Sequence, residues 1–250
     1  MAIRVPIGER EQAIGSLLDL ARSGFEEREQ GDEVELAVYT DEAGERQLRA
    51  AFGSVGSSSL DPGWEDAWRA FHRPVTVGGL WIGAPWLKPP PGAPAVVIDP
   101  GRAFGTGSHP TTRLCIELLA EVGRGSLLDV GCGSGVLSIA ASRFGFAPIV
   151  AVDLDPVAVD VTSANAAANG VALDAYALDA TIEPLPPIDV AVANVSADVV
   201  TRVLPRLRCR TVITSGYLED AVLAPDGWTR VTRSTAEGWA ADHYERESSV

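Results

Sequence analysis

The stretch "LLDVGCGSGVLSIAA", Leu127 to Ala141, decides the fold of this chain. It begins with a short apolar run typical of a buried strand, continues through glycines spaced G-x-G-x-G, and ends in a helical run. Glycine is needed where a ligand touches the backbone or where φ is positive, and the following helix offers unpaired N–H groups. We therefore expect a strand–loop–helix unit that binds a ligand at Gly131, Gly133 and Gly135.

A second glycine-rich stretch, "DPGRAFGTGSHPTTRLC" from Asp99 to Cys115, ends shortly before Leu127. Its glycines and small hydroxyl residues are typical of a loop that binds phosphate. One domain rarely needs two phosphate-binding loops, so the question is which ligand uses both stretches.

The chain from Ala95 onward alternates short β-branched runs with helical runs. We expect strands at 95–100, 126–131, 149–155, 175–180, 188–195 and 211–216, and helices at 110–123, 135–145, 156–170 and 197–208. This alternation predicts an α/β fold with a parallel, doubly wound sheet. Ligands of such sheets bind at the carboxyl ends of the strands.

Polar residues stand at the ends of these expected strands. Asp153 lies 22 residues after Gly131, about where a βαβ unit places the carboxylate that binds ribose hydroxyls. Asp155 is expected to cap the helix that opens at Pro156. Asp179 is expected either to receive an adenine amino group or to be a turn residue. Asn194 is expected to project toward the ligand, where its amide can donate and accept, or to form a turn.

These strand ends favour S-adenosylmethionine over NAD as the ligand. The G-x-G-x-G spacing differs from the G-x-G-x-x-G of dinucleotide sites, and an acid, Asp129, precedes the first glycine. S-adenosylmethionine has an adenosine but no pyrophosphate, and its ammonium can meet Asp129. We expect S-adenosyl-L-methionine as the cofactor and a class I methyltransferase fold.

Five segments carry a resemblance to a known family. "DPGRAFGTGSHPTT", "DVGCGSGVLSIAA", "AVDLDPVAV", "NAAANG" and "VANV", in this order and spacing, resemble the PrmA family of lysine methyltransferases, which modify the eleventh protein of the large ribosomal subunit. The resemblance runs from about Trp64 to the C-terminus, and "FGTGSHPTT" is its most discriminating part.

The resemblance implies that both glycine-rich stretches enclose one nucleoside with its methionine tail. In this family the first loop and its helix fold over the cofactor, which implies a lid and wall at Phe104, Gly105, Thr106, Gly107 and Thr112. Thr112 would make a direct contact, and the other family positions match Gly131, Asp153 and Asn194.

Residues 1–60 are expected to form a separate small domain. Their pattern of strands and helices, β-α-β-β-α-β, fits a ferredoxin-like α+β domain if "FEEREQ" is its second strand. The segment "EEREQGDEVE" carries six acidic residues and one arginine, which indicates either a solvated hairpin face or a docking surface. Residues 61–94 are expected to be a tryptophan-rich linker with leading strands, and residues 95–250 the methyltransferase domain. The resemblance implies that the small domain presents a basic ribosomal protein.

Composition narrows the classes of partner. A net charge of −14 argues against a nucleic-acid surface, and the chain lacks the N-P-P-[YF] run of many nucleobase methyltransferases. No run is long and apolar enough to span a membrane, and the first residues lack a secretory signal, so we expect a cytoplasmic protein. Three scattered cysteines and three scattered histidines predict neither disulfides nor a metal site. We expect a monomer.

Methyl transfer to a lysine requires the uncharged amine, which a desolvated site favours. We expect Asn194 to orient the amine or the cofactor, with no dedicated base. Three alternatives remain. The first is a methyltransferase for another protein or a small amine, and the second is a non-catalytic module that binds the cofactor, or nothing, and serves as a partner surface. The third alternative is a nicotinamide-dependent oxidoreductase. Whether NAD or S-adenosylmethionine raises the melting temperature distinguishes it from a methyltransferase.

Overall fold

The structure is a computed structural model, and its described parts form two units. It describes residues 1–10, 13–14, 16–17, 25–38, 40, 42–53, 56, 73–99 and 105–247. By internal contacts the chain divides into Met1–Phe71 with Gly101–Phe104, and His72–Pro100 with Gly105–Val250.

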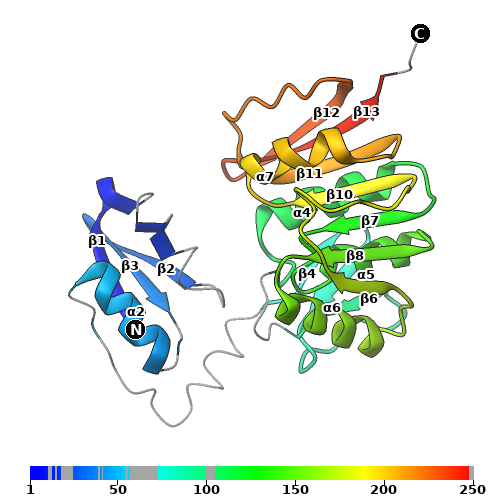
Figure 1. Ribbon diagram of the computed structural model, residues 1–250. Helices are drawn as coiled ribbons and strands as arrows, with labels where there is room; N and C mark the ends of the chain where they lie inside the picture. The colour runs from blue at the N-terminus through cyan, green and yellow to red at the C-terminus, as the bar shows by residue number, and fades with distance from the viewer. Residues whose placement is uncertain are drawn as a thin grey trace. The chain divides into compact units, whose positions relative to one another are not determined.

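The first unit contains an antiparallel sheet of three strands in the order β1-β3-β2 (Figure 1). These are β1 (Ala2–Pro6), β2 (Phe25–Gln30) and β3 (Glu33–Val38), with the 3-10 turn η1 (Ile7–Glu9) and helix α2 (Glu42–Phe52). "FEEREQ" is thus a strand, as the ferredoxin-like arrangement requires. An antiparallel bridge between Ala2 and Gly56 lies on the free side of β1, where that arrangement places its fourth strand.

The alternating apolar residues of β3 form the centre of this small core. Val34, Leu36 and Val38 are buried and pack with Ile3 and Leu48. Burial of these side chains is the main force that holds so small a unit together.

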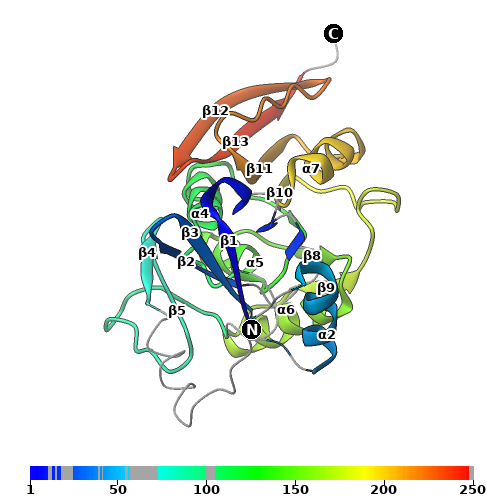
Figure 2. The ribbon, with the colours of Figure 1, turned by 90° about the vertical axis from the view of Figure 1, so that its left-hand side faces the viewer.

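The second unit is built on a seven-stranded sheet in the order β12-β13-β11-β10-β7-β8-β9 (Figures 1 and 2). Its strands are β7 (Leu127–Val130), β8 (Ile149–Asp153), β9 (Asp174–Ala177), β10 (Val190–Asn194), β11 (Thr211–Leu218), β12 (Trp228–Ala236) and β13 (Trp239–Arg246). The five strands from β7 to β11 are parallel, and β13 and β12 are antiparallel. The doubly wound α/β fold is confirmed, but the hairpin β12–β13 at one edge was not predicted.

Helices and connecting segments cover both faces of this sheet. They are α4 (Pro110–Glu121), α5 (Val136–Phe144), α6 (Pro156–Ala168), α7 (Ala197–Val203) and the 3-10 turn η2 (Leu204–Arg206). Adjacent residues of β7 point to opposite faces: Leu127 packs in the cluster of α4 and α5, and Leu128 in the cluster of α7 and η2. Both faces are therefore buried, which explains why these strands are apolar without alternation.

The segment 95–100 was predicted as a strand of the main sheet, and that prediction is wrong. β4 (Val75–Val77), β5 (Leu80–Gly83) and β6 (Ala95–Val97) form a separate three-stranded sheet. β6 pairs in parallel with β5, and its Val97 also bonds to the side chain of Asn169, the C-terminal cap of α6. The Asn169 Oδ1 accepts from Val97 N at 2.9 Å, and its Nδ2 donates to Val97 O at 2.7 Å. A buried apolar run predicts a strand but not its neighbours.

The second unit shows the cap of α6 and the state of the three cysteines. Asp155 caps α6 as expected, since its Oδ1 accepts from Val157 N at 2.9 Å. Cys115, Cys132 and Cys209 are buried free thiols. Burial raises the pKa of Cys132 and Cys209 to about 12, so these thiols stay protonated and unreactive. Within the described residues, no helix has the length and apolarity that a membrane crossing requires.

Removing the α6 cap is expected to lower stability without unfolding the protein. The Asp155→Ala variant loses the acceptor for Val157 N, which should cost about 1 kcal/mol of unfolding free energy. Chemical denaturation measures this, with Asp160→Ala on the exposed side of the same helix as the control. Equal midpoints for the two variants would show that the cap contributes nothing.

Candidate active site

The predicted site residues meet at the carboxyl edge of the parallel strands. β10, β7, β8 and β9 are parallel neighbours, so their carboxyl ends lie side by side. Gly131 follows β7, Asp153 ends β8, Asp179 follows β9 and Asn194 ends β10. The fold thus gathers four residues that are distant in sequence.

The loop after β7 has a conformation that requires glycine. Gly131 has φ of +74°, a region that side chains rarely adopt. A Cβ atom at this position would stand 2.3 Å from Cγ1 of Val195, which follows β10. The loop therefore packs its backbone directly against the turn that carries Asn194.

Asp153 is tied to the same loop. Its Oδ2 accepts from Gly133 N at 3.0 Å, and its Oδ1 accepts from Asp155 N at 3.0 Å. The carboxylate is half-buried, so its orientation is fixed while part of it faces solvent. A fixed carboxylate at the end of β8 has the chemistry to accept hydrogen bonds from a diol.

The two glycine-rich stretches are joined to each other in the folded protein. The Ser134 hydroxyl of the second stretch donates to Gly105 O of the first. Asn165 links them again, because its Nδ2 donates to Ser134 O at 2.9 Å and its Oδ1 accepts from Asp99 N at 3.1 Å. The expectation that both stretches serve one site therefore has a structural basis.

The remaining residues of the first stretch lead into α4. Thr106 and Ser108 pair through their hydroxyls at 2.9 Å, and Gly107 is buried. Thr112, in the first turn of α4, is 1% exposed, and its Oγ1 accepts from Asn194 Nδ2 at 3.3 Å. The predicted lid residue Phe104 lies outside the described residues. Thr112 and Asn194 are thus brought together from positions 82 residues apart.

Asp129 is a buried carboxylate with one satisfied oxygen. Its Oδ2 accepts from Ser138 N at 3.1 Å and from Ser138 Oγ at 2.6 Å. Its Oδ1 has no hydrogen-bond partner among the described residues. Burial raises the pKa of Asp129 to about 6, and the two bonds from Ser138 oppose that shift. An orphaned anionic oxygen of this kind suits a cationic group, which would favour its charged form.

This raised pKa predicts how Asp129 affects stability as pH changes. The folded protein binds the proton more tightly than the unfolded chain, so the stabilisation from protonated Asp129 is complete below about pH 4 and is lost as pH rises through 6. The unfolding free energy of Asp129→Asn minus that of the wild type should therefore rise by about 2 to 3 kcal/mol from pH 4 to pH 7. Denaturant titrations across this range measure the difference. A pH-independent difference would show that Asp129 titrates normally.

Asp179 has a turn role in the structure. Its Oδ1 accepts from Thr181 N at 2.9 Å and from Thr181 Oγ1 at 2.6 Å, and these bonds lower its pKa. Of the two roles expected from the sequence, the turn role is therefore present, and the adenine contact stays a prediction.

Sequence reasoning missed several residues that shape this edge. Leu154 comes directly after Asp153 and is 73% exposed. Ile182 lies three residues after Asp179 and is 72% exposed. Both side chains are therefore accessible beside the strand-end acids of β8 and β9. Gly216 of β11 was also missed, although its Cα lies so near Val195 that a Cβ would stand 2.2 Å from Val195 O. An apolar residue directly after a strand-end acid was the available signal for Leu154.

A groove at the opposite edge of the sheet holds none of these residues. Its volume is about 1370 Å³, and its lining includes Asp189 before β10 and Arg210 before β11. Ligands of doubly wound sheets bind at the other edge, where the strand ends of the candidate site lie. The carboxyl edge is therefore the candidate active site.

Comparison with known proteins decides the family. The sequence model of the PrmA family, described as ribosomal protein L11 methyltransferase, matches residues 20–248. The chain belongs to the PrmA family. It is a methyltransferase, and the methyl donor of this family is S-adenosylmethionine.

Individual relatives agree with this assignment. The chain is 37% identical over 230 residues to the ribosomal protein L11 methyltransferase of Symbiobacterium thermophilum, which covers 82% of this chain and 75% of that protein. It is 42% identical over 173 residues to that of Pelobacter propionicus, with 64% of this chain and 56% of that protein covered. A ribosomal protein L11 methylase structure from Lactobacillus delbrueckii subsp. bulgaricus matches with a TM-score of 0.61 and 26% identity, covering 68% of this chain and 96% of that one. The resemblance stated from the sequence is confirmed.

Proposed function

We propose that this PrmA-family protein transfers methyl groups from S-adenosylmethionine to lysine amines of ribosomal protein L11. The observation that carries the proposal is the joining of the two glycine-rich stretches at the end of β7, with Asn194 beside Thr112. Relatives that match over most of this chain are named for methylation of that ribosomal protein.

The residues at the carboxyl edge suit this cofactor. Asp153 would accept from the ribose hydroxyls, and the exposed side chains of Leu154 and Ile182 would flank the adenine. The orphaned Oδ1 of Asp129 would be satisfied by the ammonium, through a bridging water or a small opening of the loop, because the carboxylate is fully buried. Thr112 would form the wall that the first glycine-rich stretch contributes to the cofactor site.

Further contacts are proposed on the sequence alone. The glycine positions that would line the cofactor are Gly105, Gly107, Gly131, Gly133 and Gly135, with Phe104 and Thr106 in the lid and Asp179 at the adenine.

The chain's own residues set up the transfer by excluding water and orienting the reactants. When bound, the cofactor supplies a methyl group on a sulfonium, which is open to in-line attack. An amine at this edge would lose solvation, and desolvation lowers the pKa of an ammonium. The half-buried Asn194 amide would orient the neutral amine or the cofactor, and alignment of this kind supplies much of the rate.

Charge supports a basic protein as the substrate. The chain carries a net charge of −14, and six acidic residues lie in the ten-residue segment 26–35 at β2 and β3. We propose that residues 1–60 recognise the substrate, that 61–94 link the domains, and that 95–250 hold the cofactor. We further propose a cytoplasmic monomer with no direct contact to nucleic acid.

Intact-mass spectrometry of ribosomal protein L11 tests the function. Purified L11 is incubated with the enzyme, with and without S-adenosylmethionine, and mass steps of one methylene each are expected only with the cofactor. No steps, together with a cofactor-dependent rise in melting temperature, would exclude L11 and point to another protein or a small amine. No steps and no rise would overturn the methyltransferase function itself.

A further inference from the structure

The turn between β12 and β13 touches the first turn of α4. Trp239, the first residue of β13, meets the His109 ring edge to face, with ring centroids 4.9 Å apart and planes at 69°. Glu237 in the turn forms an ion pair with Arg113 of α4. The tip of the unpredicted hairpin therefore contacts the stretch that carries the discriminating family motif.

His109 is the N-terminal cap of α4. Its Nδ1 accepts from Thr111 N at 3.4 Å and lies 2.7 Å from Thr111 Oγ1. The ring is thus held between Thr111 and Trp239, and Thr112 is the next residue of the same turn. Since Thr112 contacts Asn194, a shift of this turn would move the proposed cofactor wall.

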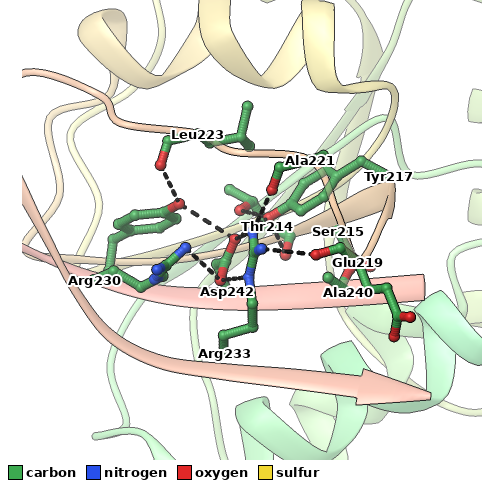
Figure 3. Close-up of polar contacts among 11 residues, drawn as sticks. Thr214, Ser215, Tyr217, Glu219, Ala221, Leu223, Arg230, Arg233, Ala240 and Asp242 are labelled. Atoms are coloured by element: carbon green, nitrogen blue, oxygen red, sulfur yellow. Dashed lines mark hydrogen bonds and ion pairs between the residues drawn. The ribbon is translucent and has the colours of Figure 1, made fainter. Parts of the chain in front are cut away.

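The hairpin that carries Trp239 is anchored firmly to the sheet, as Figure 3 shows. Asp242 of β13 is fully buried and accepts from Arg233 Nε and Nη2 of β12, each at 2.8 Å, and from the Tyr217 hydroxyl of β11 at 2.9 Å. Breaking a buried, hydrogen-bonded ion pair leaves an uncompensated charge, so these bonds resist separation of the strands. The tip therefore has a rigid base.

We propose that His109 and Trp239 are positioning residues for the methyl donor, which act by fixing the first turn of α4 and with it Thr112. The inference rests on the proposed contact of Thr112 with S-adenosylmethionine. Neither residue needs to touch the cofactor.

The cap requires the neutral imidazole, because a protonated Nδ1 cannot accept from Thr111 N. Burial lowers the pKa of His109, Glu237 opposes this shift, and Arg113 adds to it. The neutral form is therefore favoured at physiological pH. Cofactor affinity should weaken on acidification in the wild type more than in His109→Asn, whose amide oxygen caps without titrating.

Calorimetric affinity for S-adenosylmethionine, measured on the full chain, tests the inference. His109→Ala should raise the Kd about fivefold, as the loss of a cap of about 1 kcal/mol predicts. Trp239→Ala removes the aromatic contact that holds the His109 ring and should raise the Kd by a similar factor. His109→Asn and Trp239→Phe, which keep a cap or an aromatic contact, should stay within about twofold. In steady-state assays the KM for the cofactor should rise while kcat stays nearly constant.

Two further variants make the result decisive. Arg124 donates to Leu119 O and Ala120 O at the other end of α4, so Arg124→Ala should lower the melting temperature without changing the Kd. The inference is overturned if His109→Ala and Trp239→Ala behave like Arg124→Ala while Thr112→Ala weakens binding. If Thr112→Ala leaves the Kd unchanged, the proposed cofactor site is wrong, and this inference fails with it.

Discussion

Replacing Asn194 by alanine is expected to lower kcat about a hundredfold, because a reactant that is no longer held in line loses much of the rate advantage. Asn194 ends β10, is half-buried, and donates to Thr112 of the first glycine-rich stretch. In the proposed mechanism its amide orients the neutral amine or the cofactor. Single-turnover kinetics with L11 would measure the effect on the transfer step.

The neighbouring Ser196 provides the control for Asn194. Ser196 is exposed and makes no side-chain cap bond to α7, so Ser196→Ala should keep wild-type kcat. If Asn194→Ala also turned over at the wild-type rate, orientation of the amine or the cofactor would have to come from other residues.

Replacing Gly216 by alanine is expected to cost about 3 kcal/mol or more of unfolding free energy. The added Cβ would stand 2.2 Å from Val195 O and 2.6 Å from Val195 C, both backbone atoms that cannot rotate away. Gly216 also has φ of +99°. Since Val195 follows Asn194, the folded fraction should also lose activity. Denaturation and turnover are measured on the same preparation.

Gly227→Ala separates the two causes of this cost. Gly227 has φ of +76°, but nothing lies within 4 Å of the point where a Cβ would stand, so its substitution brings backbone strain without a clash. We expect a cost of about 1 kcal/mol there. If Gly216→Ala cost no more than Gly227→Ala, the contact with Val195 would not constrain the Asn194 turn.

Local patterns predicted the parallel part of the sheet and the residues at its edge. The β-branched runs marked β7 to β11, and the Asp155-Pro156 pair marked the start of α6. These features depend on neighbours in sequence, which is why they can be read from it.

Features that depend on distant partners could not be predicted in this way. The run at 95–100 was recognised as a strand, but its pairing with β5 and with the Asn169 side chain is set by tertiary contacts. The hairpin β12–β13 carries exposed polar residues and charges, so its pattern lacked a clear strand signal. The contact of His109 with Trp239 joins residues 130 positions apart.

Hydrogen exchange with and without S-adenosylmethionine tests most directly the claim that both glycine-rich stretches enclose one ligand. Addition of the cofactor should slow exchange in residues 105–112, 131–136, 153–155 and 194–196 together, with a common dependence on cofactor concentration. Protection of 131–136 and 153–155 without any change at 105–112 would contradict the claim, because the first stretch would then take no part in binding.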